Sequence, residues 1–280
     1  MRPRLFPLLL LASACASKPS PTPTTTPAPS ATAVAAAPSS SATPETPALD
    51  IPAPIRAAID AEDRSEADLA LDAGRHPDEL FAFFEVKPGM RVAELMAGTG
   101  YTAELLARIV GPEGEVYGQN NAFVLEKFAE RPWSERLKAP VNANVIRVDR
   151  ELEDPLPAEA KDLDAVFLVL FYHDSVWMET DRAAMNGAIY DALKPGGIYA
   201  VVDHAAAEGA ATSVAKTLHR IEESVVRSEI EAAGFTLERE GDFLRNSDDA
   251  RDWNASPSAS GERRGKSDRF VLKFQKPLDG

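Results

Sequence analysis

The stretch VAELMAGTGYTAELLARIV, residues 92–110, decides the fold because it begins as a strand and ends as a helix. Apolar residues dominate its first positions, and the apolar spacing after residue 100 is that of one face of a helix. The small residues between the two include Gly98 and Gly100, which permit unusual backbone dihedrals and let a ligand approach the backbone closely. Glu94 lies at the end of the strand, where its carboxylate can accept hydrogen bonds from the amine or hydroxyls of a ligand.

Strand and helix patterns alternate along the rest of the chain. Strands are predicted at 91–95, 115–119, 144–148, 164–170, 197–203, 235–240 and 269–275. Helices are predicted at 101–110, 122–130, 180–193 and 212–233, and short helical patterns precede the first strand. This alternation predicts an α/β fold with a seven-stranded, mostly parallel sheet and helices on both faces. Because no helix separates the last two strands, we expect the last strand to run antiparallel.

The turn between the first strand and its helix is the expected ligand site. Sheets of this kind bind ligands outside the carboxyl ends of their strands. The helix that starts after Gly100 presents unpaired N–H groups and the positive end of its dipole. A phosphate ligand is disfavoured, because the pattern Gly-x-Gly-x-x-Gly has Ala103 at its last position and the P-loop pattern is absent.

Three segments resemble one known family. VAELMAGTGY is similar to motif I of the class I S-adenosylmethionine-dependent methyltransferases, GPEGEVYGQN to their second strand, and LKPGGIYAVVD to their fifth. More narrowly, FYHD, VDHAAAEGA, LHRIEE, AAGF and DRFVLKFQKP look like a subgroup of bacterial predicted methyltransferases with export signals. The resemblance covers about residues 75–276. It implies a Rossmann-like fold, S-adenosyl-L-methionine as the cofactor, and methyl transfer to a small-molecule acceptor.

The resemblance also implies which residues hold the cofactor. Motif I contributes Glu94, Ala97, Gly98, Gly100 and Tyr101. Asn120 corresponds to the acidic residue that normally holds the ribose hydroxyls, and Asp149 takes the place that often contacts the adenine amino group.

Two residues depart from the family pattern. Met96 replaces the usual first glycine of motif I and narrows the expected cofactor loop. Asn120 can donate and accept hydrogen bonds, but it cannot form the charge-assisted pair that a carboxylate would. We therefore expect weaker cofactor affinity.

Three of the four histidines are predicted to lie near one rim of the sheet. His173 follows the fourth strand, His204 follows the fifth, and His219 falls in the helix after it. An acceptor hydroxyl or protonated amine needs a base during methyl transfer, and histidine suits that task at neutral pH. Our hypothesis is that His173 or His204 is the base.

Neighbouring side chains complete this hypothesis. Asp174 or Asp203 is expected to orient the imidazole, and Tyr172 to shape the methyl pocket. Alternatively, the three histidines together with Asp203 could coordinate zinc or iron. They show no recognised spacing such as His-x3-His, so the sequence assigns no metal ligand.

The first 15 residues have the features of a lipoprotein signal. Arg2 and Arg4 precede a short apolar run, and Cys15, the only cysteine, follows small residues at the cleavage position. This predicts export and lipid anchoring at Cys15, with the protein on the periplasmic face of a membrane. An ordinary secretory signal with an incidental cysteine is the alternative, and the protein would be cytoplasmic if the signal is misinterpreted.

Composition then separates a tether from a domain. Residues 16–50 are almost entirely Ala, Pro, Ser and Thr, which predicts a disordered spacer. Residues 51–280 have globular composition and include a helical cap before the sheet. Within them, the polar stretch 241–268 is typical of a lid or a disordered loop.

The net charge of -14 argues against binding of nucleic acid and against adhesion to anionic lipid. We expect a monomer by default. An exported enzyme needs a supply of a cofactor that is made in the cytosol. The alternative function is therefore a non-catalytic lipoprotein that binds a nucleoside or another metabolite with the same fold.

Overall fold

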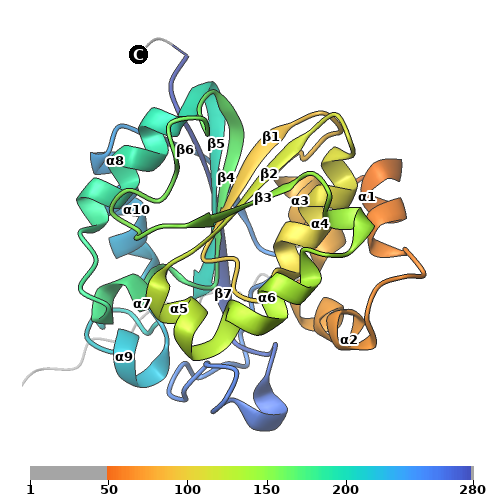
Figure 1. The fold of residues 1–280 in the computed structure, drawn as a ribbon. Helices are drawn as coiled ribbons and strands as arrows, with labels where there is room; N and C mark the ends of the chain where they lie inside the picture. Colours follow the sequence, from red (N-terminus) through yellow and green to blue (C-terminus); the bar gives the residue numbers. More distant parts are fainter. Residues whose placement is uncertain (1–48, 279–280) are drawn as a thin grey trace, which may run out of the picture. The chain divides into compact units, whose positions relative to one another are not determined.

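A seven-stranded sheet organises residues 49–278, the part of the chain that this computed structural model describes. The expected signal and most of the expected tether lie outside these residues. The strands, in chain order, are β1 (Arg91–Leu95), β2 (Glu115–Asn120), β3 (Val145–Asp149), β4 (Leu163–Val169), β5 (Leu193–His204), β6 (Thr236–Gly241) and β7 (Arg269–Gln275). Their order across the sheet is β3-β2-β1-β4-β5-β7-β6 (Figure 1).

The pairing confirms the predicted fold class. β1 to β5 pair in parallel, whereas β7 inserts between β5 and β6 and runs antiparallel to both. The predicted strands agree with the observed ones within a few residues, except that β5 begins earlier, at Leu193. Residues in the middle of β1, β4 and β5 are buried, as the apolar runs in the sequence indicate.

Helices cover both faces of the sheet. The helices before β5 are α1 (Ala53–Ile59), α2 (Glu66–Arg75), α3 (Pro77–Phe83), α4 (Tyr101–Val110), α5 (Ala122–Val124), α6 (Glu130–Arg136), α7 (Tyr172–Trp177) and α8 (Arg182–Ala192). They are followed by α9 (Ala215–Leu218) and α10 (Glu223–Ala232). In Figure 1, α8 and α10 lie on one side of the sheet, and α3, α4 and α6 lie on the other, with α1 and α2 farther out.

Two helix predictions were wrong in their extent. The helix expected at 122–130 continues through a π-helical turn, Leu125–Ala129, into α6. The helix expected at 212–233 is two helices, because His219 ends α9 in the left-handed conformation, with φ of 50°. Ile221 then pairs with Ala205 in an isolated parallel bridge, which a continuous helix would not allow. His219 is therefore the C-cap of a short helix and not a residue of a helix interior.

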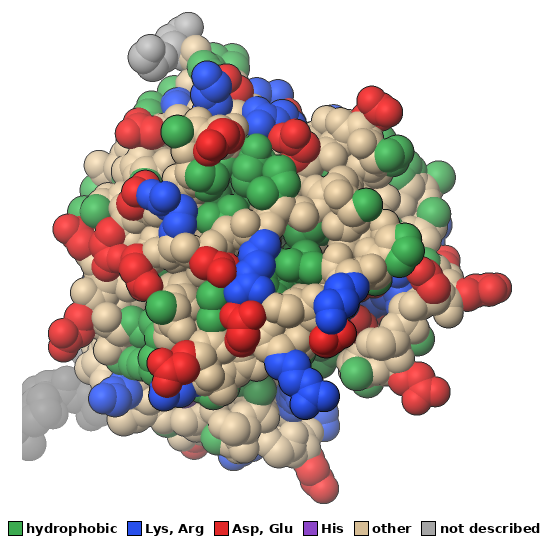
Figure 2. All heavy atoms as spheres, viewed as in Figure 1, with side chains coloured by type: hydrophobic (Ala, Val, Ile, Leu, Met, Phe, Trp, Pro, Cys, Tyr) green, Lys and Arg blue, Asp and Glu red, His purple; other side chains and the backbone are tan. Residues whose placement is uncertain are grey.

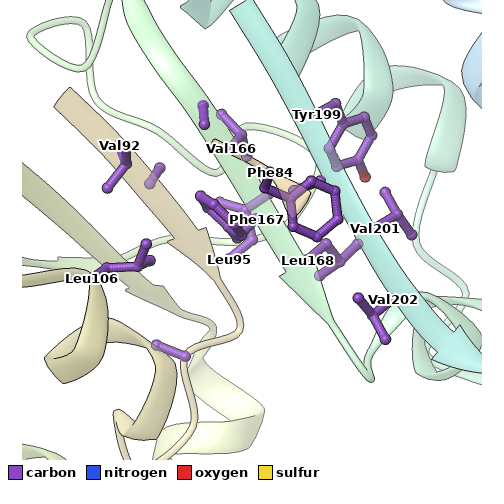
Figure 3. Close-up of a cluster of buried hydrophobic side chains, with 14 of the residues drawn as sticks. Phe84, Val92, Leu95, Leu106, Val166, Phe167, Leu168, Tyr199, Val201 and Val202 are labelled. Carbon is purple, nitrogen blue, oxygen red and sulfur yellow. The ribbon is translucent and has the colours of Figure 1, made fainter. Parts of the chain in front are cut away.

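The core lies between the sheet and the helical layers. Figure 3 shows side chains of β1, β4 and β5 packed together with Phe84, which follows α3. The rings of Phe84 and Phe167 meet edge to face, with centroids 5.6 Å apart. The helical cap before β1 is thus part of the core, because Phe84 is buried against the central strand β4.

The polar stretch 241–268 packs around one buried ion pair. Arg220 donates to Asp249 at 2.8 Å, and both side chains are almost fully buried. Asp249 also accepts hydrogen bonds from the Trp253 indole and from the backbone N–H groups of Arg251 and Asp268. These donors hold the pKa of Asp249 below its usual value despite its burial.

The surface carries both charge signs. On the face shown in Figure 2, Lys and Arg side chains are interspersed with Asp and Glu, and hydrophobic side chains surface between them. Among residues 49–278, no helix combines the length and the apolar character that crossing a bilayer requires.

The buried ion pair makes a stability prediction. Asp249→Ala should lower the free energy of unfolding by about 3–5 kcal/mol, because it leaves the Arg220 guanidinium buried without a counter-charge. The exposed neighbour Asp248 offers a matched control, and Asp248→Ala should change stability by less than about 0.5 kcal/mol. Urea unfolding of both variants is the measurement, and equal midpoints would contradict the role given to Asp249.

Candidate active site

The bend after β1 is held by the neighbouring strand β2. Met96 N donates to the side-chain oxygen of Gln119 at 2.9 Å, and Ala97 N donates to the Gln119 carbonyl at 2.9 Å. Met96, Gly98 and Gly100 all have positive φ angles, of 54°, 58° and 88°. Met96 therefore adopts a conformation that glycine takes more easily, which fits its position at the first glycine of the motif.

Asn120 clamps this bend through both groups of its side chain. Its Oδ1 accepts from Gly98 N at 2.8 Å, and its Nδ2 donates to the Gly98 carbonyl at 3.1 Å. A carboxylate at this position could accept but not donate, so an amide suits the bend better than the acidic residue of the family pattern. The Asn120 side chain is fully buried and engaged with the loop rather than free for a ribose hydroxyl.

The segment around α6 covers the same bend. The Trp133 indole lies so close to Gly100 that a Cβ there would stand 2.2 Å from it, so glycine is required for packing as well as for φ. Arg136 donates to the Thr99 carbonyl at 2.6 Å and to Asp68 of α2 at 2.8 Å. The bend is thus enclosed by β2, α6 and the helical cap.

Glu94 is a buried acidic residue in β1, just before the bend. It is buried, and its Oε2 has no hydrogen-bond partner among residues 49–278. Burial raises its pKa to about 8, although the Thr102 hydroxyl and the Arg75 guanidinium oppose that rise. The unliganded side chain therefore keeps its proton at neutral pH, and a ligand cation at Oε2 would favour the ionised carboxylate.

Arg75, at the end of α2, is the complementary charge. Its guanidinium lies 4.5 Å from the centre of the Tyr101 ring. Burial lowers the pKa of Arg75, and the charge of Glu94 opposes that shift. Among the described residues, no carboxylate forms an ion pair with Arg75. The Tyr101 hydroxyl donates to Asp72 at 2.7 Å, so Tyr101 faces the cap.

Arg75 and Tyr101 line a small cavity of about 10 Å³ with Thr102, Leu170 and Arg269. Such a volume holds about one water molecule. Glu94 is not among the residues that line this cavity.

The predicted histidine cluster is present at the carboxyl ends of β4 and β5. The carboxylate of Asp203, fully buried at the end of β5, lies 2.7 Å from His173 Nδ1. It also accepts the backbone N–H groups of His173 and His204, each at 2.7 Å. Asp203 therefore orients the His173 ring, as the sequence analysis suggested, and ties the start of α7 to β5.

A second carboxylate faces the other side of the same ring. Asp174 Oδ1 lies 3.1 Å from His173 Nε2 and 3.0 Å from His219 Nδ1, and it accepts from the Trp177 indole at 2.7 Å. Burial alone would lower the pKa of His173, but Asp203 and Asp174 outweigh it and raise that pKa to about 10.

His204 has a different environment. Its ring centroid is 5.7 Å from that of His173, and its Nδ1 lies 2.7 Å from the Ser267 hydroxyl. Burial and the positive charge of His173 hold the pKa of His204 well below its usual value. The two candidate bases therefore differ in charge at neutral pH.

Two of the expected site residues, Tyr172 and Asp149, form contacts with other parts of the protein. The buried Tyr172 hydroxyl donates to Glu229 of α10 at 2.8 Å and accepts from Asn186 of α8 at 2.9 Å, which anchors α7 to these helices. Asp149 is exposed at the end of β3 and pairs with Arg147 of the same strand at 2.8 Å.

Sequence reasoning missed several residues of the site. Arg75, Gln119, Trp133 and Ser267 act only through contacts between segments far apart in the chain. Gln119 had one local signal, because it lies beside Asn120 at the end of a predicted strand. The others carry no motif, so their roles depend on tertiary packing.

A larger groove lies at the residues that follow β5. It has a volume of about 690 Å³ and begins at Ala205 and Ala206, directly after His204. Charged side chains of both signs line the rest of it, including Glu222, Arg227 and Arg245. The volume is that of a typical small-molecule pocket.

The fold is similar to those of several proteins of known structure. A SAM-dependent methyltransferase from Aquifex aeolicus is similar with a TM-score of 0.53 and 18% identity, over 76% of this chain and 94% of that one. The [4+2]-cyclase SpnF is similar with a TM-score of 0.53 and 16% identity, over 78% of this chain and 85% of that one. No protein-family model and no curated protein sequence matches the chain. The chain therefore has the Rossmann-like fold of SAM-dependent methyltransferases.

The raised pKa of Glu94 predicts a pH-dependent stability. Between the unfolded pKa near 4.5 and the folded pKa of about 8, the folded chain keeps a proton that the unfolded chain loses. This contribution is complete below the lower value and is lost as pH rises through the upper one. Between these limits, the free energy of unfolding of the wild type should therefore fall by on the order of 2–4 kcal/mol relative to that of Glu94→Gln. Urea unfolding of both chains at pH 5 and pH 9 measures it, and parallel curves would contradict it.

Proposed function

We propose that this chain binds S-adenosyl-L-methionine at the Met96–Gly100 bend and transfers a methyl group to a small-molecule acceptor. The observation that carries the proposal is the buried Glu94 just before the glycine bend, whose Oε2 has no hydrogen-bond partner among residues 49–278. A buried carboxyl oxygen without a hydrogen-bond partner lowers the stability of the fold. A ligand that donates a hydrogen bond to this oxygen explains why the residue is retained.

The amino-acid end of the cofactor fits these residues. Its ammonium group would meet Glu94 Oε2, and its carboxylate would meet the Arg75 guanidinium. Each of the two side chains shifts the pKa of the other toward its charged form. Glu94 is buried and Arg75 is half-buried, and removal from water strengthens charge-assisted hydrogen bonds.

The nucleoside end fits less readily. Asn120 uses both side-chain groups on Gly98, and the cavity lined by Arg75 and Tyr101 has room for about one water molecule. Binding therefore requires the bend or the cap around Arg75 to open. This cost agrees with the weaker affinity expected from Met96 and Asn120.

The cofactor, when bound, supplies a methyl group on a positively charged sulfur. The chain must then hold the acceptor in line and remove its proton. His204 is the better candidate for this base. Among residues 49–278, only Nδ1 of the His204 ring has a hydrogen-bond partner, Ser267, whereas both ring nitrogens of His173 face carboxylates. The groove lined by Ala205 and Ala206, which follow His204 in the chain, is our candidate place for the acceptor.

The alternative is a binding module without catalysis. The engaged Asn120 amide favours it, because the ribose contact of the family pattern is replaced by a structural one. A [4+2]-cyclase shares the fold, so the fold alone does not imply methyl transfer.

We also propose that the chain is exported and contacts a membrane only through a lipid on Cys15. The support is the Arg2–Cys15 sequence pattern. Labelling of the wild type and of Cys15→Ala with a radioactive fatty acid tests it, since a label on both chains would remove the anchor from Cys15.

The cofactor proposal predicts specific losses of affinity. Glu94→Gln and Arg75→Met should each weaken binding of S-adenosyl-L-methionine by about tenfold or more, because each removes a charge-assisted contact. Exposed residues give matched controls, and Glu113→Gln and Arg56→Met should bind within about twofold of wild type. Calorimetry with the cofactor and its demethylated product is the measurement. Equal affinity in all four variants, or no binding by the wild type, would contradict the proposal.

Turnover distinguishes the enzyme from the binding module. His204→Gln should reduce formation of the demethylated product by about a hundredfold while cofactor affinity stays the same, because the base is lost but the cofactor contacts are not. The assay uses a panel of small phenols, amines and thiols as acceptors. Cofactor binding without turnover of any acceptor by the wild type favours the module, and unchanged turnover in His204→Gln removes His204 from the mechanism.

A further inference from the structure

We infer that His173, Asp174 and His219 form a binding site for one divalent transition-metal ion of the zinc or iron class. The two histidines and the aspartate come from α7 and from the end of α9, which pack against each other at the carboxyl edge of the sheet. The inference does not rest on the proposed methyl transfer, because it concerns only these three side chains.

The three candidate ligand atoms form a nearly regular triangle. His173 Nε2 and His219 Nδ1 are 3.3 Å apart, and Asp174 Oδ1 lies 3.1 Å and 3.0 Å from them. A metal ion with ligand bonds of about 2.0–2.1 Å separates adjacent ligands by about 3.3 Å in a tetrahedron and by about 2.9 Å in an octahedron. The observed separations span this range, so a cation can contact all three atoms from one side of the triangle.

The surrounding contacts are those of metal-binding histidines and carboxylates. A metal-bound histidine usually gives its other ring N–H to a carboxylate, which fixes the ring orientation. His173 does so, since its Nδ1 is 2.7 Å from the fully buried Asp203. Asp174 is held in turn by the Trp177 indole at 2.7 Å.

The exposure of the three side chains leaves one side of the site open. The His173 side chain is only 3% exposed, whereas those of Asp174 and His219 are 14% and 24% exposed. An ion here would be anchored on its buried side and would keep coordination positions for water or a ligand on the other. Two imidazoles and one carboxylate favour zinc, iron or cobalt over magnesium or calcium, which prefer oxygen ligands.

This ligand set differs from the one the sequence suggested. His204 is near, but its Nδ1 bonds to Ser267, and it does not join the group of mutually close ligand atoms. Asp203 contacts His173 from behind and is a positioning residue rather than a ligand. Asp174 takes the place of His204 and Asp203 as the third candidate ligand.

The test is titration of the full-length chain, first freed of metal with a chelator, with Co²⁺ and with Zn²⁺. We expect one Co²⁺ per chain, visible absorption bands typical of imidazole-bound cobalt, and loss of these bands when Zn²⁺ is added. His219→Asn and Asp174→Asn should each weaken Co²⁺ binding by at least about tenfold.

His76 provides a matched control. Like His219 it caps a helix in the left-handed conformation, with φ of 45° against 50°, and it lies near a carboxylate, Glu79. Asparagine tolerates this conformation, so His76→Asn and His219→Asn should both fold. Normal binding by His76→Asn with loss in His219→Asn supports the site. No binding by the wild type, or wild-type binding by both His219→Asn and Asp174→Asn, overturns it.

Discussion

The rest of the structure depends on how the backbone of the Met96–Gly100 bend is satisfied. Polar groups of this bend are buried where β1 ends, and β2 supplies their partners through Gln119 and Asn120. Burying a peptide group without a hydrogen-bond partner costs free energy. The hydrogen bonds from Gln119 and Asn120 therefore fix both the bend and the start of α4. Trp133 then closes over Gly100, which joins α6 to the same unit.

The histidine rim depends on a second buried group, the carboxylate of Asp203. It accepts hydrogen bonds from the backbone of α7, from the backbone of β5 and from the His173 ring. One side chain thereby fixes where α7 starts and how His173 points. The two parts of the site follow one principle: a polar side chain at a strand end organises the loop of its neighbour.

The sequence predicted the sheet better than the site. Buried parallel strands produce apolar runs that are visible locally, so six of the seven strands were placed within two residues. Spacing also predicted that His173 and His204 would meet, because both follow strands at one edge. It could not predict that Asn120 bonds to Gly98, that Tyr172 turns toward α8 and α10, or that Arg75 lies near Glu94. These contacts depend on packing between distant segments. The predicted helix around His219 ends at that residue, because Ile221 pairs with Ala205.

The place of β7 has a consequence for how the chain is made. Among the described strands, β6 pairs only with β7, and β7 follows it in the sequence after the long 241–268 segment. During synthesis, β6 therefore has no strand to join until residues 269–275 leave the ribosome. Such non-local pairing delays folding of the sheet edge. Until then the unpaired edge of β6 remains exposed to chaperones and to pairing with other chains.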